Sequence, residues 1–254
     1  MSGILFRLAA IMLLVPGSLM AAPLKIAAPD FEPFFNKKTG SGLFVELIRE
    51  TFKAIPSQRE RPIQLLFRNN IRHEQELAAG KVDAAANVFR LEGFKGHLSK
   101  PFFRYKDYAI SIKKKAINLK TIEDLSRYSV GSYKGAKIFR GPRFKAAVEN
   151  SKRFYKETPR AHMVANLVAF NRVDIGVGDI YIFLNTLRTL PGQHRPDNFD
   201  YHGIFEVKYS YMGFRDKKLR DEFNTAYESI KKSGRYEAIY ESWLRELKAP
   251  VKVH

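Results

Sequence analysis

The regular alternation of strand-like and helix-like hydrophobic patterns constrains the fold of this chain more than any other feature. In the N-terminal half, three short apolar runs alternate with two segments of helically spaced apolar residues: strands at Leu24–Ala28, Ile63–Phe67 and Val82–Val88, and helices at Leu43–Ile55 and His73–Gly80. The alternation returns further along, with strands at Tyr128–Tyr133 and Val173–Val177 and a helix at Met163–Phe170. Strands that alternate with helices pair in parallel, in a sheet that the helices cover. The sequence therefore predicts an α/β protein with mainly parallel sheets.

A short internal repeat links the two halves of the chain. Leu77–Asp83 (Leu-Ala-Ala-Gly-Lys-Val-Asp) resembles Val168–Asp174 (Val-Ala-Phe-Asn-Arg-Val-Asp). Both segments combine a helix end, a turn and a basic–Val–Asp sequence at the start of a strand. The repeat favours two similar α/β lobes, with Asp83 and Asp174 as turn residues of structural importance.

Two amphipathic helices and two further strands complete the pattern. Apolar residues lie on one helical face in 219–230 and again in 236–247, and Gly234 ends the first of these helices. We expect both apolar faces to pack in the core. Strands at Tyr108–Ile112 and Val207–Gly213 lie between the expected lobes, so they are candidates for the segments that cross from one lobe to the other.

The first 21 residues have the layout of a secretory signal peptide. Arg7 precedes a short apolar run that Pro16 and Gly17 interrupt, and small residues follow up to the expected cleavage site after Ala21. The apolar run is shorter than the ~20 residues of a membrane span, so we favour a cleaved signal over an anchor. The chain contains no cysteine, which excludes a lipoprotein anchor, disulfides and thiolate chemistry. We expect an exported, periplasmic protein.

The charge balance is strongly basic, with 44 Lys and Arg residues, 26 Asp and Glu residues and a formal net charge of +18. Such an excess suggests nucleic-acid binding, but RNP-type, helix-turn-helix and zinc-finger signals are absent, and an exported protein rarely meets that partner. Nine basic and two acidic residues lie between Lys134 and Arg160. Helix N-termini and basic side chains favour anions, so an anionic ligand, a solvated basic face and attraction to anionic envelope polymers all remain open for this segment.

No arrangement of residues typical of catalysis or of cofactor binding stands out. The six histidines have no ligand partner at metal-binding spacing, and no G-x-S-x-G nucleophile elbow occurs. The Gly176–Gly178 segment lacks the third glycine of a dinucleotide-binding loop and lies within an expected strand. No pair of carboxylates forms an evident acid–base couple. We therefore expect a binding protein without metal or cofactor, and not an enzyme.

Four stretches, in this order, carry a family resemblance: Phe31–Phe34 with Gly42–Leu47, Gly80–Asp83 with Leu98–Phe102, Arg172–Asp174 with Gly178–Asp179, and Asp216–Asp221 through Ser233–Tyr236 to Tyr240–Trp243. Their order and spacing resemble the periplasmic solute-binding proteins of polar amino acid ABC transporters, family 3. The resemblance covers essentially all of the mature chain.

The resemblance implies the type II periplasmic-binding fold, with two lobes that each contain a mainly parallel sheet flanked by helices, and two crossing strands as a hinge. Residues 22–108 and 207–254 would form lobe 1, and residues 109–206 would form lobe 2. It further implies a monomer that captures a small polar solute between the lobes, closes over it by hinge motion and is recognised by an ABC permease. The solute would be an amino acid or a related amine or organic acid.

The resemblance also implies candidate ligand-binding residues. In members of the family, an arginine of lobe 1 grips the ligand carboxylate and an acidic residue of lobe 2 takes the amine. Asp179 fits the amine role, because it follows an apolar strand and a glycine. Phe31 and Phe34 are candidates for an aromatic wall that stacks on the ligand.

The chain departs from the family pattern at two places. The segment from Arg90 to Lys95 (Arg-Leu-Glu-Gly-Phe-Lys) has no arginine at the expected place, so Arg90 is the candidate substitute and Lys95 a weaker one. The family's Gly-Ser/Thr of lobe 2 is Gly135-Ala136 here. Both departures argue against an ordinary α-amino acid as the ligand.

Two alternative functions share this fold. One is a ligand-sensing protein without a permease. The other is an enzyme like cyclohexadienyl dehydratase, which decarboxylates and dehydrates a prephenate-like acid. That chemistry needs a positioned proton donor, for which Glu32 and Glu92 are the candidates.

Overall fold

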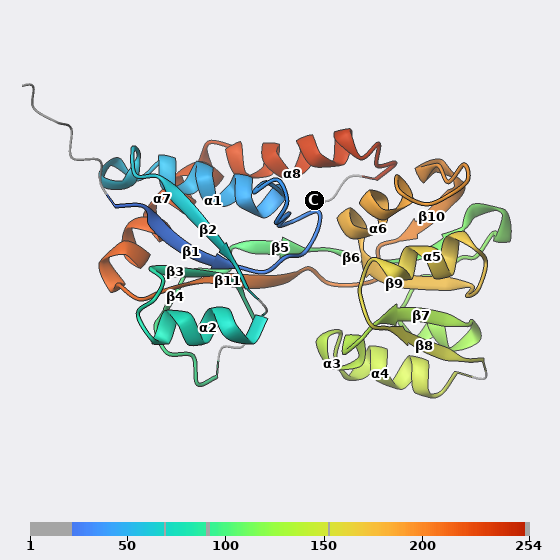
Figure 1. Ribbon diagram of the computed structural model, residues 1–254. Coiled ribbons are helices and arrows are strands. Elements are labelled where there is room, and N and C mark those ends of the chain that lie inside the picture. The colour runs from blue at the N-terminus through green and yellow to red at the C-terminus, as the bar shows by residue number, and fades with distance from the viewer. Residues whose placement is uncertain (1–21, 69, 90–91, 152, 252–254) are drawn as a thin grey trace, which may run out of the picture.

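The computed structural model describes residues 22–68, 70–89, 92–151 and 153–251. The expected signal peptide, residues 1–21, and the candidate ligand residue Arg90 lie outside the described residues. The described chain forms two α/β lobes side by side, each around its own sheet, and two segments run between them (Figure 1).

Lobe 1 is built around a six-stranded sheet with the strand order β2-β1-β3-β11-β4 and with β5 also paired to β11. The strands are β1 (Leu24–Ala28), β2 (Ile63–Phe67), β3 (Ala84–Val88), β4 (His97–Leu98), β5 (Phe103–Tyr105) and β11 (Lys208–Phe214). Strands β2, β1 and β3 are parallel, and β11 is antiparallel to β3. The helices of this lobe are α1 (Leu43–Lys53), α2 (Asn70–Ala78), α7 (Lys217–Lys232) and α8 (Arg235–Glu246), with a 3₁₀ turn η1 (Pro56–Gln58). Helices α1, α7 and α8 cover one face of the sheet and α2 the other (Figure 1).

Lobe 2 repeats this plan with a five-stranded sheet of order β10-β6-β9-β7-β8. The strands are β6 (Asp107–Ile112), β7 (Val130–Tyr133), β8 (Tyr155–Thr158), β9 (Ile175–Asp179) and β10 (Phe199–His202). The helices are α3 (Ala136–Phe139), α4 (Pro142–Glu149), α5 (Met163–Ala169) and α6 (Ile180–Leu187), with 3₁₀ turns η2 (Lys113–Lys115), η3 (Glu123–Arg127) and η4 (Pro196–Asn198). Strands β9, β7 and β8 are parallel, whereas β6 is antiparallel to β9 and β10 to β6. The mainly parallel α/β architecture predicted from the alternating pattern is confirmed.

The chain crosses between the lobes twice. It passes from β5 through Lys106 into β6, and it returns from β10 through 203–207 into β11. The expected crossing strands are thus β6 and β11, each of which also pairs within the sheet of one lobe. The boundary expected after residue 108 falls inside β6, because hydrogen bonding to β9 already begins at Asp107.

A buried aromatic cluster joins the two lobes beside these crossing segments. The ring of Tyr181, in α6, lies 5.9 Å from that of Tyr240, in α8, and 6.0 Å from that of Phe34. The Tyr181 hydroxyl donates a hydrogen bond to the backbone oxygen of Tyr240 at 3.3 Å. The lobes therefore share one continuous apolar core at the hinge.

Helix α1 illustrates how local sequence sets an element. Its buried residues include Leu43, Leu47 and Ile48, at the spacing that places them on the face toward the core. The helix ends at Lys53, two residues before the predicted end at Ile55. The residue before a proline is disfavoured in helical conformation, and Ile55 precedes Pro56 with extended backbone angles.

The internal repeat corresponds to one structural motif that occurs in both lobes. Gly80 follows α2 and Asn171 follows α5, and both have left-handed backbone angles, with φ of 70° and 54°. In each case the next amide donates to a carbonyl five residues earlier, from Lys81 to Glu76 and from Arg172 to Leu167. This is the Schellman helix end, and it requires a residue such as Gly or Asn that tolerates positive φ.

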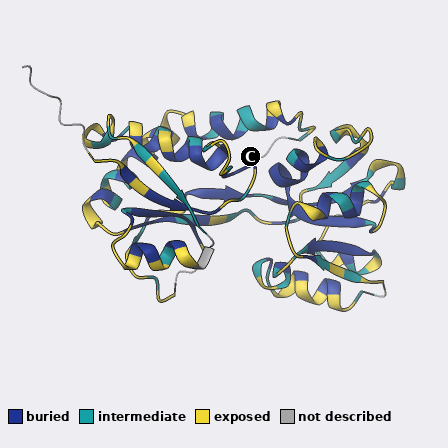
Figure 2. Ribbon diagram, viewed as in Figure 1, coloured by how far each residue is buried: buried dark blue, intermediate teal, exposed yellow. Residues whose placement is uncertain are grey.

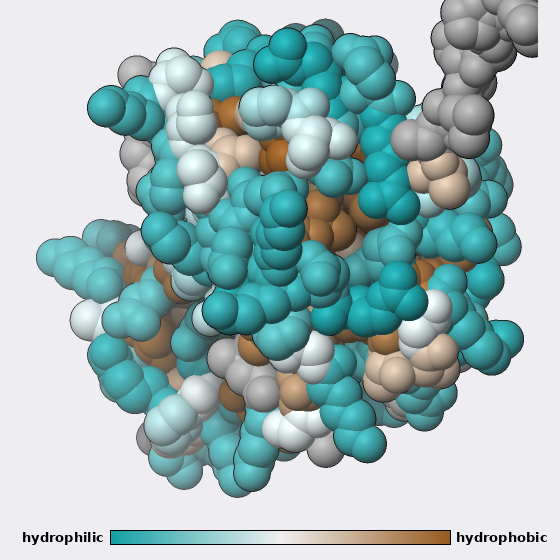
Figure 3. Space-filling model, turned by 90° about the vertical axis from the view of Figure 1, so that its left-hand side faces the viewer, coloured by the Kyte–Doolittle hydropathy of each residue, from teal (hydrophilic) through white to brown (hydrophobic). Residues whose placement is uncertain are grey.

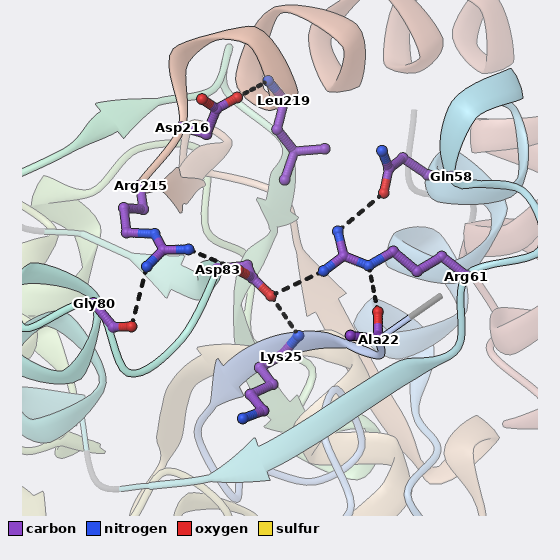
Figure 4. A network of polar contacts seen from close by, with 9 residues as sticks. All are labelled: Ala22, Lys25, Gln58, Arg61, Gly80, Asp83, Arg215, Asp216 and Leu219. Atoms are coloured by element: carbon purple, nitrogen blue, oxygen red, sulfur yellow. Dashed lines mark hydrogen bonds and ion pairs between the residues drawn. The ribbon is translucent and has the colours of Figure 1, made fainter. Parts of the chain in front are cut away.

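The aspartates that end the repeat make equivalent contacts. Asp83 precedes β3, and its carboxylate accepts the backbone N–H of Lys25 in β1 at 3.0 Å, with Arg61 and Arg215 as further partners (Figure 4). Asp174 precedes β9, and its carboxylate accepts the backbone N–H of Ser129 at 3.0 Å. Each aspartate thus ties the start of one parallel strand to its neighbour, which confirms their structural roles.

Polar side chains cover most of the outer surface. Buried residues gather in the two sheets and on the inner faces of the helices (Figure 2). The outer face of lobe 1 is mainly hydrophilic, with hydrophobic side chains in small areas between polar ones (Figure 3). Within the described residues, no helix combines the length and the apolar character that crossing a membrane would require.

Candidate ligand-binding cleft

A cleft of about 970 Å³ lies between the two lobes. Lobe 1 lines it with the loop between β1 and α1, the end of β3 and Tyr105 of β5, and lobe 2 lines it with the start of β6, the ends of β7, β8 and β9, and α6. The carboxyl ends of parallel strands from both sheets therefore open onto the same space, where open α/β sheets bind their ligands. The volume is in the range of small-molecule sites.

Asp179 lines this cleft at the last position of β9, where it also caps α6. Its Oδ1 atom accepts the backbone N–H groups of Tyr181 at 2.9 Å and Ile182 at 3.4 Å, and its Oδ2 atom accepts that of Lys106 at 3.0 Å. Burial and the neighbouring charge of Asp107 raise the pKa of Asp179 to about 8. A ligand cation would favour the charged form of this carboxyl group.

Asp107 lies directly beside Asp179, because the two residues are paired across β6 and β9. The Tyr133 hydroxyl donates to Oδ2 of Asp107 at 2.8 Å, and the guanidinium Nε of Arg140 lies 3.4 Å from the same oxygen. Burial raises the pKa of Asp107, while Arg140 and the Tyr133 hydrogen bond act in the opposite direction. The buried cation of Arg140 is thus matched by Asp107. In the described part of the chain, no basic side chain forms an ion pair with Asp179.

Asn87 is a cleft residue that the sequence reasoning missed. It lies near the end of β3 with φ of 64°, and it is buried. Its Oδ1 atom accepts hydrogen bonds from the hydroxyls of Tyr105 and Ser210, both at 2.6 Å. The side-chain amide N–H groups are therefore the part of Asn87 that is left for a ligand. A single polar residue in the otherwise apolar strand Ala84–Val88 was the signal that could have revealed it.

The two candidate aromatic residues have different positions. Phe31 is half-buried and lines the cleft. Phe34 is fully buried and does not line it; its ring stacks on Phe44 at 4.2 Å and contacts Tyr105 at 5.1 Å. In this conformation Phe34 is therefore a core residue, because Phe44 of α1, Tyr105 and Tyr181 pack around its ring. A second cleft ring is Phe89, which is 40% exposed.

The exposed charged side chains divide between the two walls of the cleft. Asp30 and Glu32 line it from lobe 1, and Lys134 and Arg160 line it from lobe 2. All four are exposed. Since Arg90 lies outside the described residues, its predicted contact with a ligand carboxylate stays a prediction.

The chemistry of the cleft suits binding of a polar molecule. It combines carboxylates, cations, aromatic rings and an amide, and hydrogen bonds hold Asp179, Asp107 and Asn87 in place. Among the described residues, no group of three His, Asp or Glu side chains could hold a metal ion. Glu32 lines the cleft, whereas Glu92 is exposed elsewhere, so of the two candidate proton donors only Glu32 is placed for a reaction there.

Comparisons with known proteins agree with this picture. A scan against protein-family models finds no match, and a search of curated proteins finds none either. Among solved structures, the chain is similar to an ancestral arginine-binding protein bound to arginine, with 21% identity over 88% of this chain and 99% of the other and a TM-score of 0.61. It is similar to the amino acid ABC transporter substrate-binding protein AbpA from Streptococcus pneumoniae bound to L-arginine, with 16% identity over 89% and 96% of the chains and a TM-score of 0.60.

A third similar structure is the ancestral amino acid-binding protein AncCDT-1, a precursor of cyclohexadienyl dehydratase, with 20% identity over 87% of this chain and 95% of the other and a TM-score of 0.61. These likenesses extend over both lobes and agree with the family 3 resemblance of the sequence. Two sheets, two crossings and an inter-lobe cleft lead to one conclusion: the chain has the two-lobed type II periplasmic-binding fold.

Proposed function

We propose that this protein captures a small polar solute between its two lobes. The solute carries an amine and is an amino acid or a related compound. The observation that carries the proposal is the cleft of about 970 Å³ lined from both lobes, in which Asp179 supplies a buried carboxyl group without a basic partner among the described residues. Similar structures with bound arginine support this class of ligand.

Each proposed ligand residue has a separate role. Asp179 binds the amine, because its Oδ2 atom accepts only one hydrogen bond from the described chain. Phe31 offers its half-buried ring to the aliphatic or aromatic part of the ligand. Arg90 is the candidate in lobe 1 for binding a ligand carboxylate, and this role rests on the sequence resemblance alone.

Ligand binding is tested by thermal unfolding of the chain from residue 22 onward. A panel of basic, neutral and acidic amino acids, their decarboxylated amines and small organic anions should contain a compound that raises Tm, since a ligand that binds only the folded state stabilises it by mass action. Titration calorimetry then gives its Kd. If no compound in the panel raises Tm or gives a binding isotherm, the proposal fails.

The role of Asp179 is tested by Asp179→Asn, which keeps the helix cap but cannot carry a charge. This variant should lose most of the affinity for an amine-bearing ligand. Asp216→Asn is the matched control, because Asp216 caps α7 by accepting the N–H of Leu219 at 2.7 Å (Figure 4) and is not among the residues that line the cleft. Unchanged affinity in Asp179→Asn would remove Asp179 from the site.

Export through a cleaved signal peptide and delivery to an ABC permease are proposed on the sequence resemblance and on the similarity to one ABC substrate-binding protein. Uptake of the labelled ligand should fall when the gene for this protein is deleted. Unchanged uptake would favour the sensing alternative.

An enzymatic function is the second candidate, because one similar structure is a precursor of cyclohexadienyl dehydratase and Glu32 lies in the cleft. Incubation with prephenate and ultraviolet detection of phenylpyruvate decides between the two. We expect no product; formation of phenylpyruvate that Glu32→Gln abolishes would replace the binding proposal.

A further inference from the structure

We propose that Lys134 and Arg160 form an anion-binding subsite on the lobe 2 wall of the cleft, which holds an anionic group of the ligand such as a carboxylate. This inference rests on the proposed function, because it concerns the same cleft. It adds that the ligand is zwitterionic or otherwise carries an anionic group, and that lobe 2 binds this group.

The sheet places both cations at one edge. Lys134 follows directly after β7, and Arg160 lies two residues after the end of β8. Strands β7 and β8 are parallel and in register up to the pair Tyr133–Thr158. The backbone N–H of Lys134 extends this ladder by donating to the carbonyl of Thr158 at 2.9 Å. Both side chains therefore leave adjacent strand ends, and both line the cleft.

Three other cations of the basic segment 134–160 have carboxylate partners. Arg140 pairs with Asp107, Lys137 with Glu149 and Arg143 with Glu123, at 3.4, 3.1 and 2.8 Å. These pairs explain part of the basic excess as ordinary structural ion pairs.

Lys134 and Arg160 differ from these three residues, because both line the cleft and neither has an ion-pair partner among the described residues. Within the described residues, neither side chain makes a hydrogen bond or an ion pair. The nearest acidic residue along the chain, Glu157, uses its carboxylate to accept the N–H of Gly135 at 3.1 Å and the hydroxyl of Tyr155 at 3.0 Å. Two unpaired cations in a ligand-sized cleft are suited to binding an anion.

The opposite wall and the adjoining strand end carry the complementary charge. Asp30 and Glu32 line the cleft from lobe 1, and Asp179 lies at the end of β9, next to β7. A zwitterion can place its anionic group on Lys134 and Arg160 and its ammonium near these carboxyl groups. Such a ligand would contact both lobes through opposite charges, and so it would favour their closure.

The test pairs each amino acid with its decarboxylated amine, for example L-arginine with agmatine and L-lysine with cadaverine. For the pair that contains the best ligand, Kd is measured with the wild type and with Lys134→Met, Arg160→Met and the double variant. Lys145→Met and Arg153→Met are the controls, because both residues are exposed, lie outside the cleft and lose the same charge. We expect the double variant to raise Kd for the amino acid by about 10- to 100-fold, the usual effect of a charged hydrogen bond. Kd for the amine should change little.

Other outcomes separate this inference from the proposed function. If Arg90→Met causes the loss and the double variant binds normally, the carboxylate partner is Arg90, and the subsite is refuted while the proposed function stands. The subsite is also refuted if the amine binds as tightly as the amino acid. If no compound binds the wild type, both proposals fall together.

Discussion

Replacing Asp179 by asparagine should make the ligand-free protein more stable, and the gain should grow as the pH rises. Asparagine keeps an oxygen that can accept the N–H groups of Tyr181 and Ile182, and it caps helices as well as aspartate does. It cannot ionise, so it removes the cost of placing a negative charge in a buried position beside Asp107. The substitution thus separates the electrostatic cost of the site from its role in the fold.

The expected size follows from the pKa of Asp179, which is about 8 in the folded protein against an ordinary value of 3.8. Folding raises the pKa of this acid, so the unfolded chain loses its proton first and the free energy of unfolding falls between about pH 4 and pH 8. At pH 7 the cost relative to a residue that cannot ionise is about 4 kcal/mol, at about 1.4 kcal/mol per pH unit. The variant loses the hydrogen bond from the N–H of Lys106, which costs about 1–2 kcal/mol. The net gain expected at pH 7 is therefore about 2–3 kcal/mol.

Urea unfolding of the wild type and of Asp179→Asn at several pH values between 4.5 and 8 measures this difference. The wild type should lose stability relative to the variant as the pH rises, and the variant should be the less stable protein near pH 4.5. Asp216→Asn reports the effect of the same chemical change at a helix cap outside the cleft. A difference between wild type and Asp179→Asn that stays constant with pH would refute the reasoning.

Five further substitutions, in three comparisons, test other parts of the structure by urea unfolding. Phe34→Ala should cost about 3–5 kcal/mol as a buried aromatic truncation, whereas Phe31→Ala should cost far less and instead weaken ligand binding; equal losses of stability would contradict the assigned positions. Gly176→Ala should cost about 1–3 kcal/mol, because a Cβ there would overlap a valine of α5, and Gly178→Ala should be tolerated, with its nearest atom at 3.9 Å; the reverse order would refute this packing. Asp174→Ala should cost about 1–2 kcal/mol at neutral pH. Although burial acts to raise the pKa of Asp174, its hydrogen bonds lower that pKa to about 2, so this loss should disappear as the pH falls from 4 toward 2, and a loss that persists there would argue against it.

Much of the fold could be read from local sequence signals. Strands β1 and β2 have the predicted bounds, because segments of five mostly apolar residues between turn signals leave little choice. The repeated helix ends at Gly80 and Asn171 were also visible in the local sequence, because a backbone with positive φ is adopted by few residue types. The aspartates that follow them were assigned correctly because the segment that contains each one is short and self-contained.

Positions within the aromatic loop could not be read in this way. Phe31 and Phe34 lie three residues apart in the same aromatic segment, yet one lines the cleft and the other is enclosed by Phe44 and Tyr105. The sequence shows only that both side chains are apolar. Whether each one is buried depends on its contacts with helix α1 and strand β5, which lie in other segments of the chain.

The sequence by itself determined the alternation of elements, the repeat of one motif in two lobes and the basic net charge, all of which depend on neighbouring residues. Only the tertiary structure decided how charge is distributed around the cleft. It brought Asp107 beside Asp179 across a strand pair, and it paired Lys137, Arg140 and Arg143 with carboxylates while Lys134 and Arg160 line the cleft without an ion-pair partner among the described residues. The physical reason is that electrostatic interactions depend on distance and burial, which packing sets, and not on position along the chain.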